Sequence, residues 1–322
     1  MKAICPSEPG GPEVLTLREF PDPVPGPEQI VVETTAIGVN YIDVYHRRAL
    51  YAVPRPIPLG LEGAGVVVAA GERVSTPRVG ARVAWCQAPG SYSTRVVVPA
   101  ERAVELPDAV DDRVAAALLL QGMTAHYLST DTFPLGASHS ALIHAAAGGV
   151  GLLLVQLAKR AGARVFGTVS TPEKAALARA AGADEIILYR EQDFELEVRR
   201  LTTGRGVDVV YDSVGKSTVD KSLRALRPRG YLVLFGQSSG AVSPLDPQAL
   251  SAGGSLFLTR PTLAHYTRDR AELLGRASAL FQAFSEGALD VRISKAFPLS
   301  EARAAHEALE GRETTGKILL IP

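Results

Sequence analysis

The sequence predicts an α/β protein with two domains, one a doubly wound parallel sheet and the other mostly β and assembled from discontinuous segments. The chain has 322 residues, more than one hydrophobic core comfortably organises. Between residues 139 and 236, strand-like runs alternate with helical patterns, which is typical of parallel sheets. Before residue 120, short β-like runs are separated by Pro/Gly clusters. We expect one domain from 1–122 with 265–322, and the other from 123–264.

The first part of the chain is expected to form a barrel-like β unit. Its β-like runs cover 14–20, 29–39, 63–74, 81–86 and 92–99. After residue 265 we expect a long helix at 271–287, a mixed segment at 293–312 and a last strand at 317–322. This tail most simply completes the first domain.

The middle of the chain repeats the order strand, crossover helix, strand. Strands are predicted at 139–146, 164–170, 185–190, 207–214 and 231–236. Helices are predicted at 149–162, 171–182, 193–202 and 217–230. Parallel strands joined by crossover helices form a doubly wound sheet, which binds ligands at the carboxyl ends of its strands.

Composition excludes several classes of protein. The 34 basic and 34 acidic residues balance, so global charge favours neither nucleic acid nor an anionic membrane as a partner. Cys5 and Cys86 are too few for a disulfide framework or a four-thiolate zinc site. The sequence has no 18-residue apolar run and no signal-peptide pattern at its start. We therefore expect a soluble cytoplasmic protein.

The stretch 142–159, LIHAAAGGVGLLLVQLAK, concentrates glycine where a strand should pass into a helix. On the dinucleotide fingerprint G-x-G-x-x-G it aligns as Ala146, Gly148 and Gly151, so the first glycine is missing. Free amide groups of the helix N-terminus would receive the pyrophosphate. The alternative is an ordinary tight turn, but the surrounding strand–helix repeat favours dinucleotide binding.

The end of the second strand indicates which dinucleotide is bound. NAD sites usually carry an acidic residue there, but this chain reads GTVSTPEK and ends the strand in Val169 and Ser170. Ser170 or Thr171 could simply cap the next helix. Lys174 lies in the first turn of that helix, where a cation opposes the helix dipole unless an anion is near. A 2′-phosphate would be that anion, so NADPH is favoured over NADH, with Tyr189 and Arg190 at the same edge of the sheet.

The sequence lacks the residues of metal-assisted and Tyr-Lys hydride transfer. Where a zinc alcohol dehydrogenase would have Gly-His-Glu, this chain has Gly60, Leu61 and Glu62, and its six histidines show no ligand spacing. A Tyr-x-x-x-Lys pair is also absent. A hydride donor without a Lewis acid suits an acceptor that is electrophilic by conjugation, such as a quinone or an enone.

These blocks resemble the zinc-independent, medium-chain NADPH:quinone oxidoreductases, the ζ-crystallin group. The resemblance covers essentially the whole chain and rests on GGPEVL, AIGVNYIDVYHR, PLGLEGAGVV, GMTAHYL, HAAAGGVG, VDVVYDSVG, LFGQSSG and TTGKILLIP. It implies a Rossmann-type NADPH-binding domain beside a GroES-like catalytic domain, and reduction of quinones by NADPH without a metal. A homodimer joined through an edge of the cofactor sheets is also implied, and the apolar runs at 231–236 and 255–261 would suit such an edge.

The resemblance also implies roles for particular residues. Asn40, Asp43, Tyr45 and Tyr51 would line the cleft for nicotinamide and quinone, although Asn40 to Tyr45 could equally be a capped helical turn. The implied cofactor-binding residues are Thr124, Ala147, Gly148, Gly149, Val150, Gly151, Ser170, Lys174, Tyr189, Phe235, Gly236, Gln237, Ser238 and Arg312. No metal ligand is implied.

Two departures and three alternatives accompany this interpretation. Gln121 stands where lysine is expected before GMT, and Gln237 replaces the usual asparagine after FG. The first alternative is an NADPH-dependent alkenal or enone reductase, and the second is an NADPH-binding protein with little catalysis. The third, an RNA-binding regulator, is disfavoured by the neutral charge and by the lack of an aromatic-basic motif.

Overall fold

The computed structural model describes residues 1–322, and the chain forms two compact units. Unit 1 contains Met1–Met123 and Thr267–Pro322, and unit 2 contains Thr124–Tyr266. No helix combines the length and the apolar character needed to cross a lipid bilayer.

Unit 2 is built on a six-stranded, fully parallel sheet. Its strand order is β10-β9-β8-β11-β12-β13. The strands are β8 (Ser140–Ile143), β9 (Arg164–Val169), β10 (Glu185–Leu188), β11 (Val207–Asp212), β12 (Leu226–Leu234) and β13 (Phe257–Thr259). The chain runs outward from β8 to β10 and then restarts beside β8 with β11. This reversal is the switch point of a Rossmann-type sheet, so the predicted fold class is confirmed.

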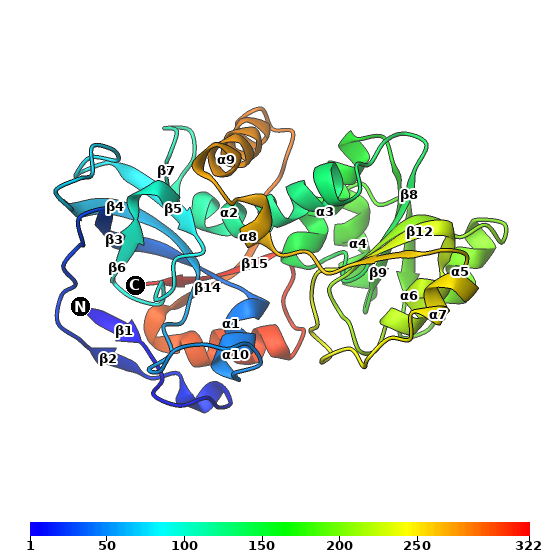
Figure 1. Ribbon diagram of the computed structural model, residues 1–322, viewed down its shortest axis with the longest axis horizontal. Helices are drawn as coiled ribbons and strands as arrows, with labels where there is room; N and C mark the ends of the chain where they lie inside the picture. The colour runs from blue at the N-terminus through cyan, green and yellow to red at the C-terminus, as the bar shows by residue number, and fades with distance from the viewer. The chain divides into compact units, whose positions relative to one another are not determined.

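Helices follow the strands of unit 2 as crossovers (Figure 1). The crossover helices are α3 (Gly149–Arg160), α4 (Pro172–Ala180), α5 (Phe194–Leu201), α6 (Val219–Arg224) and α7 (Gln248–Ala252). A π-helical segment, η3 (Leu128–Thr132), precedes β8, and α8 (Leu263–Tyr266) follows β13. Because crossovers are right-handed, the reversal puts α3 with α4 on one face and α5 with α6 on the other. Leu142, Phe166, Val210 and Leu232 belong to the hydrophobic core between the sheet and the α5/α6 layer.

One predicted helix was too long. The helical pattern at 217–230 ends at Arg224, and β12 already begins at Leu226. Pro228 has no amide hydrogen to continue a helix, and Arg229 takes a left-handed conformation with φ 58°. The pairing of β11 with β12 shifts register over this stretch. The segment is therefore the irregular start of a strand. Its sequence resembles that of the last turn of a helix.

Unit 1 contains a seven-stranded, mostly antiparallel sheet. The order is β14-β15-β3-β4-β5-β7, and β6 also pairs with β3. The strands are β3 (Gln29–Val39), β4 (Glu62–Ala70), β5 (Arg82–Cys86), β6 (Arg95–Pro99), β7 (Ala103–Glu105), β14 (Ile293–Pro298) and β15 (Lys317–Ile321). A separate pair consists of β1 (Lys2–Ile4) and β2 (Leu17–Glu19). The tail of the chain thus inserts its last strand between β14 and β3.

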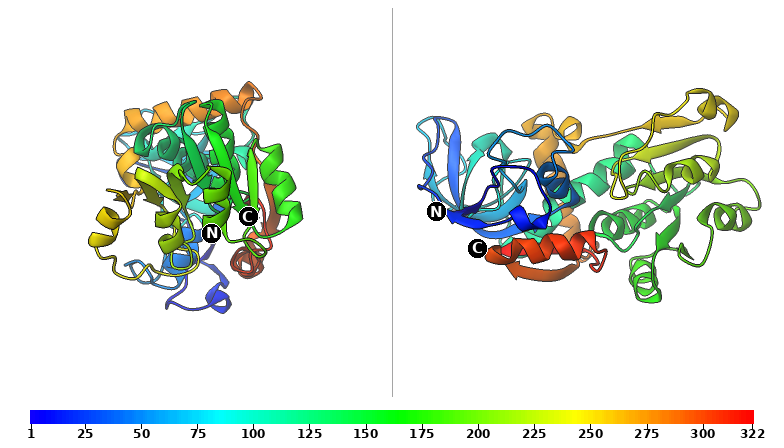
Figure 2. Two further views of the ribbon diagram at one scale, coloured as in Figure 1. Left: turned by 90° about the vertical axis from the view of Figure 1, so that its right-hand side faces the viewer. Right: turned by 90° about the horizontal axis from the view of Figure 1, so that it is seen from below.

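Helices cover this sheet and bring distant parts of the chain together. They are α1 (Tyr41–Arg47), α2 (Asp112–Tyr127), α9 (Arg270–Ser285) and α10 (Ala302–Glu310), with 3-10 turns η1 (Pro12–Val14), η2 (Ala100–Arg102) and η4 (Leu299–Glu301). In Figure 2 the red helix α10 lies beside the blue segment that carries η1. One core includes Ile37, Tyr92 and Leu320, and a second includes Ile30 and Trp85.

Candidate functional site

The glycine-rich bend lies where β8 passes into α3, as predicted. Gly148 is the extended residue before the helix, which begins at Gly149. A Cβ on Gly151 would lie 2.3 Å from the carbonyl oxygen of Ala145, so any larger residue would force the helix away from the turn. The amides of the first helical turn have no partner within the helix. Close packing and unpartnered amides are what a bound pyrophosphate requires.

A neighbouring strand makes room for the alanine that replaces the first fingerprint glycine. Ala146 is fully buried, and its amide donates to the carbonyl oxygen of Thr168 on β9 at 3.1 Å. A Cβ on Gly167, also on β9, would come within 2.8 Å of the Ala146 methyl group. Gly167 therefore supplies the space that a glycine at position 146 would have left. The glycine fingerprint alone does not reveal this pair.

The residues predicted for the 2′-phosphate side lie at adjacent strand ends. Ser170 follows β9 and Tyr189 follows β10, and the amide of Tyr189 donates to the carbonyl oxygen of Val169 at 3.1 Å. Thr171 caps α4, because its hydroxyl accepts from the amide of Lys174 at 3.3 Å. Tyr189 is 38 % exposed. Unit 2 thus brings Ser170, Lys174 and Tyr189 to one corner of the sheet.

Residues 235–238 leave the carboxyl end of β12 and are tied to the end of β11. The amide of Phe235 donates to the carbonyl oxygen of Asp212 at 2.9 Å, and that of Ser238 donates to Ser213 at 3.1 Å. A Cβ on Gly236 would lie 2.5 Å from the carbonyl oxygen of Ser213. Gly236 is therefore required for the close contact of the two strand exits.

A buried hydrogen-bonded chain, which sequence reasoning missed, supports these strand exits. Asp212 accepts from the amides of Val214 and Gly215 and from the hydroxyl of Ser222. Because Ser222 donates to Asp212, it accepts from His144 Nε2 at 2.9 Å, and His144 Nδ1 accepts from Thr168. Burial lowers the pKa of His144, so the imidazole is neutral and its single hydrogen lies on Nε2.

The dimensions of this edge fit an extended dinucleotide. From β10 to β12 there are four strand spacings, or roughly 19 Å at about 4.8 Å each. The glycine bend lies between the two ends. Thr124 is buried on α2, and Arg312 belongs to unit 1, where it is exposed in the turn after α10 with φ 58°.

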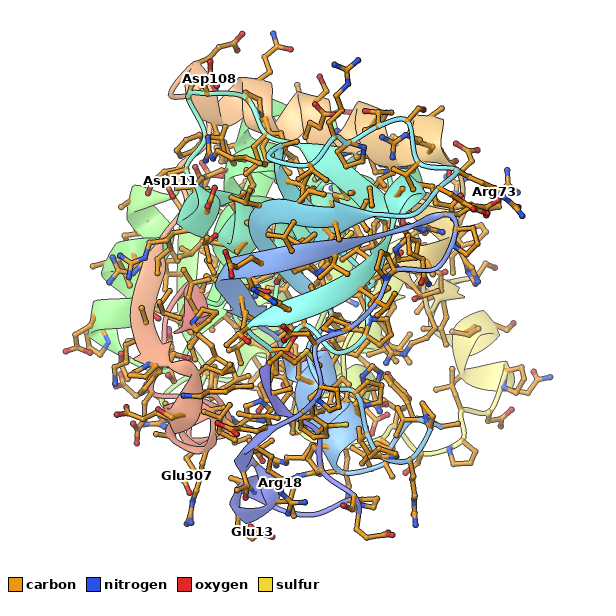
Figure 3. All side chains as sticks on the ribbon, turned by 90° about the vertical axis from the view of Figure 1, so that its left-hand side faces the viewer. Glu13, Arg18, Arg73, Asp108, Asp111 and Glu307 are labelled. Atoms are coloured by element: carbon orange, nitrogen blue, oxygen red, sulfur yellow. The ribbon has the colours of Figure 1, made fainter.

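In unit 1, Asn40 lies in a buried polar cluster together with Glu62, Lys317 and Gln121. Lys317 Nζ donates to Asn40 Oδ1 at 2.9 Å and forms an ion pair with Glu62. Asn40 Nδ2 donates to Glu62 Oε1 at 2.6 Å, and Gln121 Nε2 donates to Asn40 Oδ1 at 3.1 Å. Lys317 and Glu62 are 1 % and 0 % exposed. By contrast, the charged side chains labelled in Figure 3 (Glu13, Arg18, Arg73, Asp108, Asp111 and Glu307) are exposed.

Asp43 is fully buried and fixes the start of α1. Its Oδ2 accepts from the amide of Asn40 at 2.8 Å and from the hydroxyl of Tyr92 at 3.0 Å, whereas Oδ1 has no partner. Burial therefore raises the pKa of Asp43 to about 7. The carboxyl group therefore lies in the interior of unit 1, next to the main chain of Asn40.

The same chain of hydrogen bonds continues to His306. Arg47 only donates, so His306 Nδ1 accepts from Arg47 Nη1 at 3.0 Å, and Nε2 carries the hydrogen that it donates to Tyr92 at 2.9 Å. Burial, together with the positive charge of Arg47, lowers the pKa of His306 to about 3. Arg47 in turn pairs with Glu310 at 2.6 Å.

The predicted tyrosines form an aromatic group on and after α1. The ring centroids of Tyr45 and Tyr51 are 5.4 Å apart in an edge-to-face arrangement, and Tyr41 lies 5.8 Å from Tyr45. Tyr45 is 7 % exposed, and Tyr51 is half-buried. The structure thus brings Tyr45 and Tyr51 together.

The side chains at the position of a dehydrogenase zinc site do not fit zinc. Leu61 is buried where a histidine ligand would stand, and Glu62 binds Lys317, Asn40 and the amide of Leu120. Cys86 is fully buried, and burial raises the pKa of its thiol to about 12. No group of three or more His, Cys, Asp or Glu side chains is arranged to hold a metal ion.

Two protein-family models match the chain. Residues 26–108 match the alcohol dehydrogenase GroES-like domain, and residues 149–274 match the zinc-binding dehydrogenase family. The first match falls in unit 1, whose sheet carries the Asn40 cluster. The second begins at the first residue of α3.

Full-length relatives are also similar. A quinone oxidoreductase of Pseudomonas aeruginosa is 46 % identical, with 97 % of each chain covered. A 2-haloacrylate reductase of Burkholderia is 45 % identical, with 97 % of this chain and 96 % of the relative covered. The crystal structure of Escherichia coli quinone oxidoreductase complexed with NADPH superposes with a TM-score of 0.98 at 43 % identity, covering all of both chains.

Proposed function

Because the chain belongs to the quinone oxidoreductase family of medium-chain dehydrogenases, we propose that it is an NADPH-dependent quinone oxidoreductase. NADPH supplies a hydride, which with one proton converts a quinone to a hydroquinone and leaves NADP⁺. The observation that carries the proposal is full-length similarity to quinone oxidoreductases together with a sheet edge that has a glycine bend and Lys174 but no acidic residue at the end of β9.

The cofactor is proposed to lie along the carboxyl edge of the unit 2 sheet. Residues 147–151 bind the pyrophosphate through the free amides at the start of α3, and Ser170, Lys174 and Tyr189 hold the adenosine 2′-phosphate half. Residues 235–238 bind the nicotinamide half. Thr124 and Arg312 complete the proposed set of cofactor-binding residues. Unit 2 is thus the proposed NADPH-binding domain, and unit 1 is the proposed catalytic domain.

The unit 1 residues are proposed to bind and orient the acceptor. The rings of Tyr45 and Tyr51 offer apolar faces for a flat conjugated ring. Asp43 is buried, so it acts by holding the main chain of Asn40 rather than by contacting the acceptor. The reaction is proposed to need no metal, because Lys317 already binds Glu62, the single carboxylate at the zinc position.

The proposal is tested by following NADPH and NADH oxidation with 9,10-phenanthrenequinone and 1,4-benzoquinone, with and without EDTA. We expect turnover that prefers NADPH and is unaffected by EDTA. Lys174→Ala should raise the NADPH dissociation constant about tenfold and leave that for NADH unchanged, because one charge-assisted contact to phosphate is lost. NADPH binding without oxidation by any acceptor would instead indicate a binding protein with little catalysis.

A second candidate activity is reduction of a conjugated carbon–carbon double bond. It is favoured by the 2-haloacrylate reductase that is 45 % identical to this chain. A hydride delivered to the β-carbon of an alkenal or a haloacrylate needs the same cofactor position. Comparing kcat/KM for 2-chloroacrylate, an alkenal and 9,10-phenanthrenequinone decides between the two acceptor classes.

A homodimer and a cytoplasmic location are also part of the proposal. β13 is an edge strand, and Phe257 and Leu258 are 49 % and 38 % exposed on it. The Phe257 ring stacks on Tyr231 at 4.4 Å, which makes this edge a firm apolar surface for a second copy. Light scattering of Leu258→Lys should give half the wild-type mass. Cys5 and Cys86, both free thiols, suit a reducing compartment, which cell fractionation tests.

A further inference from the structure

The carboxamide of Asn40 is already occupied by hydrogen bonds inside unit 1. Its Oδ1 accepts from Lys317 Nζ at 2.9 Å and from Gln121 Nε2 at 3.1 Å. Its Nδ2 donates to Glu62 Oε1 at 2.6 Å and has the carbonyl oxygen of Gly38 at 3.4 Å. Asn40 is only 4 % exposed. It is therefore poorly suited to contact an acceptor, although the sequence resemblance implied that role.

The chemistry of the partners fixes which way each amide points. Lys317 only donates and Glu62, as its ion-pair partner, only accepts, so Asn40 must direct Oδ1 to Lys317 and Nδ2 to Glu62. Gln121 meets the oxygen of Asn40 and must therefore donate through Nε2. Reversal of either carboxamide would place two donors or two acceptors against each other.

Gln121 is the member of this cluster that is not fully buried. It lies on α2 and is half-buried, whereas Asn40, Glu62 and Lys317 are all less than 5 % exposed. One hydrogen of its Nε2 points to Asn40, and the second hydrogen and Oε1 make no hydrogen bond within the protein. The cluster thus presents a single oriented amide group.

We propose that Gln121 donates a hydrogen bond to the carbonyl oxygen of the acceptor, and that Lys317 and Glu62 are positioning residues that orient it through Asn40. The inference rests on the proposed function and identifies the group that recognises a carbonyl acceptor. When a hydride reaches a quinone or enone, negative charge develops on that oxygen, and a donor held in place needs no reorientation to stabilise it. A buried Lys–Glu pair serves here to fix an orientation.

The first test compares three variants of the full-length protein in 9,10-phenanthrenequinone reduction. Gln121→Met has a similar length and no donor, and kcat/KM for the quinone should fall about tenfold with an unchanged NADPH dissociation constant. Gln121→Lys can still donate both to Asn40 Oδ1 and to the acceptor, so it should stay within about threefold of wild type. Gln282→Met is the matched control, because Gln282 on α9 is exposed and its side chain hydrogen-bonds to Glu286, outside the Asn40 cluster. Equal losses in the Met and Lys variants at position 121 would overturn the proposal.

The second test measures the coupling between Gln121 and the positioning pair. Lys317→Met combined with Glu62→Gln removes both charges together, so no unpaired charge stays buried. We expect this double variant to lose about as much kcat/KM as Gln121→Met, and the triple variant to lose no more. If the loss of kcat/KM in the triple variant equals the product of the losses in the double variant and in Gln121→Met, the Lys317–Glu62 pair does not act through Gln121. If the double variant does not fold, the Met and Lys comparison at position 121 still decides.

A binding measurement separates this inference from the proposed function. Side-chain amide NMR signals of ¹⁵N-labelled protein are recorded with duroquinone, and the Gln121 signal is identified by its absence in Gln121→Met. We expect that signal to shift while the Gln282 signal does not. A shift without turnover would reject the proposed function but support the contact between Gln121 and the quinone. Turnover without a shift would support the proposed function but reject that contact. Absence of both would reject both.

Discussion

Asp43 and His306 should make opposite contributions to the pH dependence of stability. Burial raises the pKa of Asp43 from 3.8 to about 7, so between these values the folded protein holds a proton that the unfolded chain has lost. The contribution of this proton to the free energy of unfolding is complete below pH 3.8 and is lost as pH rises to 7. Burial lowers the pKa of His306 from 6.5 to about 3, so the unfolded chain binds the extra proton. That contribution is complete above pH 6.5 and is lost as pH falls to 3.

The two contributions are of similar size. At about 1.4 kcal/mol per pH unit, the shift of Asp43 from 3.8 to about 7 corresponds to about 4 kcal/mol, and that of His306 from 6.5 to about 3 corresponds to about 5 kcal/mol. Because their signs differ, they nearly cancel between pH 3.8 and 6.5 in the wild-type protein. In a variant that lacks one of the two groups, the pH dependence of the free energy of unfolding shows the contribution of the other group.

The assay is urea unfolding of the wild type, Asp43→Asn and His306→Gln at pH 5, 6 and 7. Relative to wild type, the free energy of unfolding of Asp43→Asn should rise by about 2 kcal/mol from pH 5 to 7. That of His306→Gln should fall by about 2 kcal/mol over the same range. Both variants keep hydrogen-bonding groups for Tyr92. A difference from wild type in the free energy of unfolding that is the same at every pH therefore measures lost contacts. Only a difference that changes with pH measures the change in proton binding. Differences that stay flat with pH would refute the reasoning.

Three further predictions concern the turn and the buried hydrogen-bonded chain of unit 2. Gly167→Ala should lower the free energy of unfolding by about 1–3 kcal/mol, because the new methyl group meets Ala146, and Ala146→Gly in the same protein should recover most of it; urea titration that finds no recovery would contradict the pairing. Ala145→Gly should stabilise by up to about 1 kcal/mol, since Ala145 has φ 51°, and a lower melting temperature would argue against strain there. Ser222→Ala should cost about 1–3 kcal/mol by leaving His144 Nε2 unpaired, and an unchanged denaturation curve would exclude that bond.

Local sequence signals predicted most of the framework. The alternation of apolar runs with helical patterns identified the parallel sheet, because crossover helices leave a 3.6-residue period that is easy to see. The glycines at 148–151 marked the bend after β8, and Thr171 with Pro172 marked the start of α4. These features depend on residues close together in the chain.

Contacts between distant residues could not be predicted in the same way. Gly167 on β9 leaves space for Ala146, which follows the neighbouring strand β8. Nothing in the sequence around either residue indicates that the two lie close together. Lys317 begins an apolar last strand and Glu62 interrupts an apolar run, which hints that each needs a partner, but their pairing depends on the position of β15 beside β3. The early end of α6 was missed because 217–224 continues smoothly into residues with helical propensity.

The place of β15 sets an order for folding during synthesis. This strand separates β14 from β3, so the sheet of unit 1 is incomplete until the chain beyond residue 316 has left the ribosome. Unit 2 is finished earlier, at Tyr266. At 5–20 residues per second, the edge of β3 waits roughly 10–40 s after residue 123 has been made. Lys317, at the start of that strand, neutralises the buried charge of Glu62 last, so a nascent chain with a truncated tail exposes both an unpaired strand edge and an unpaired carboxylate.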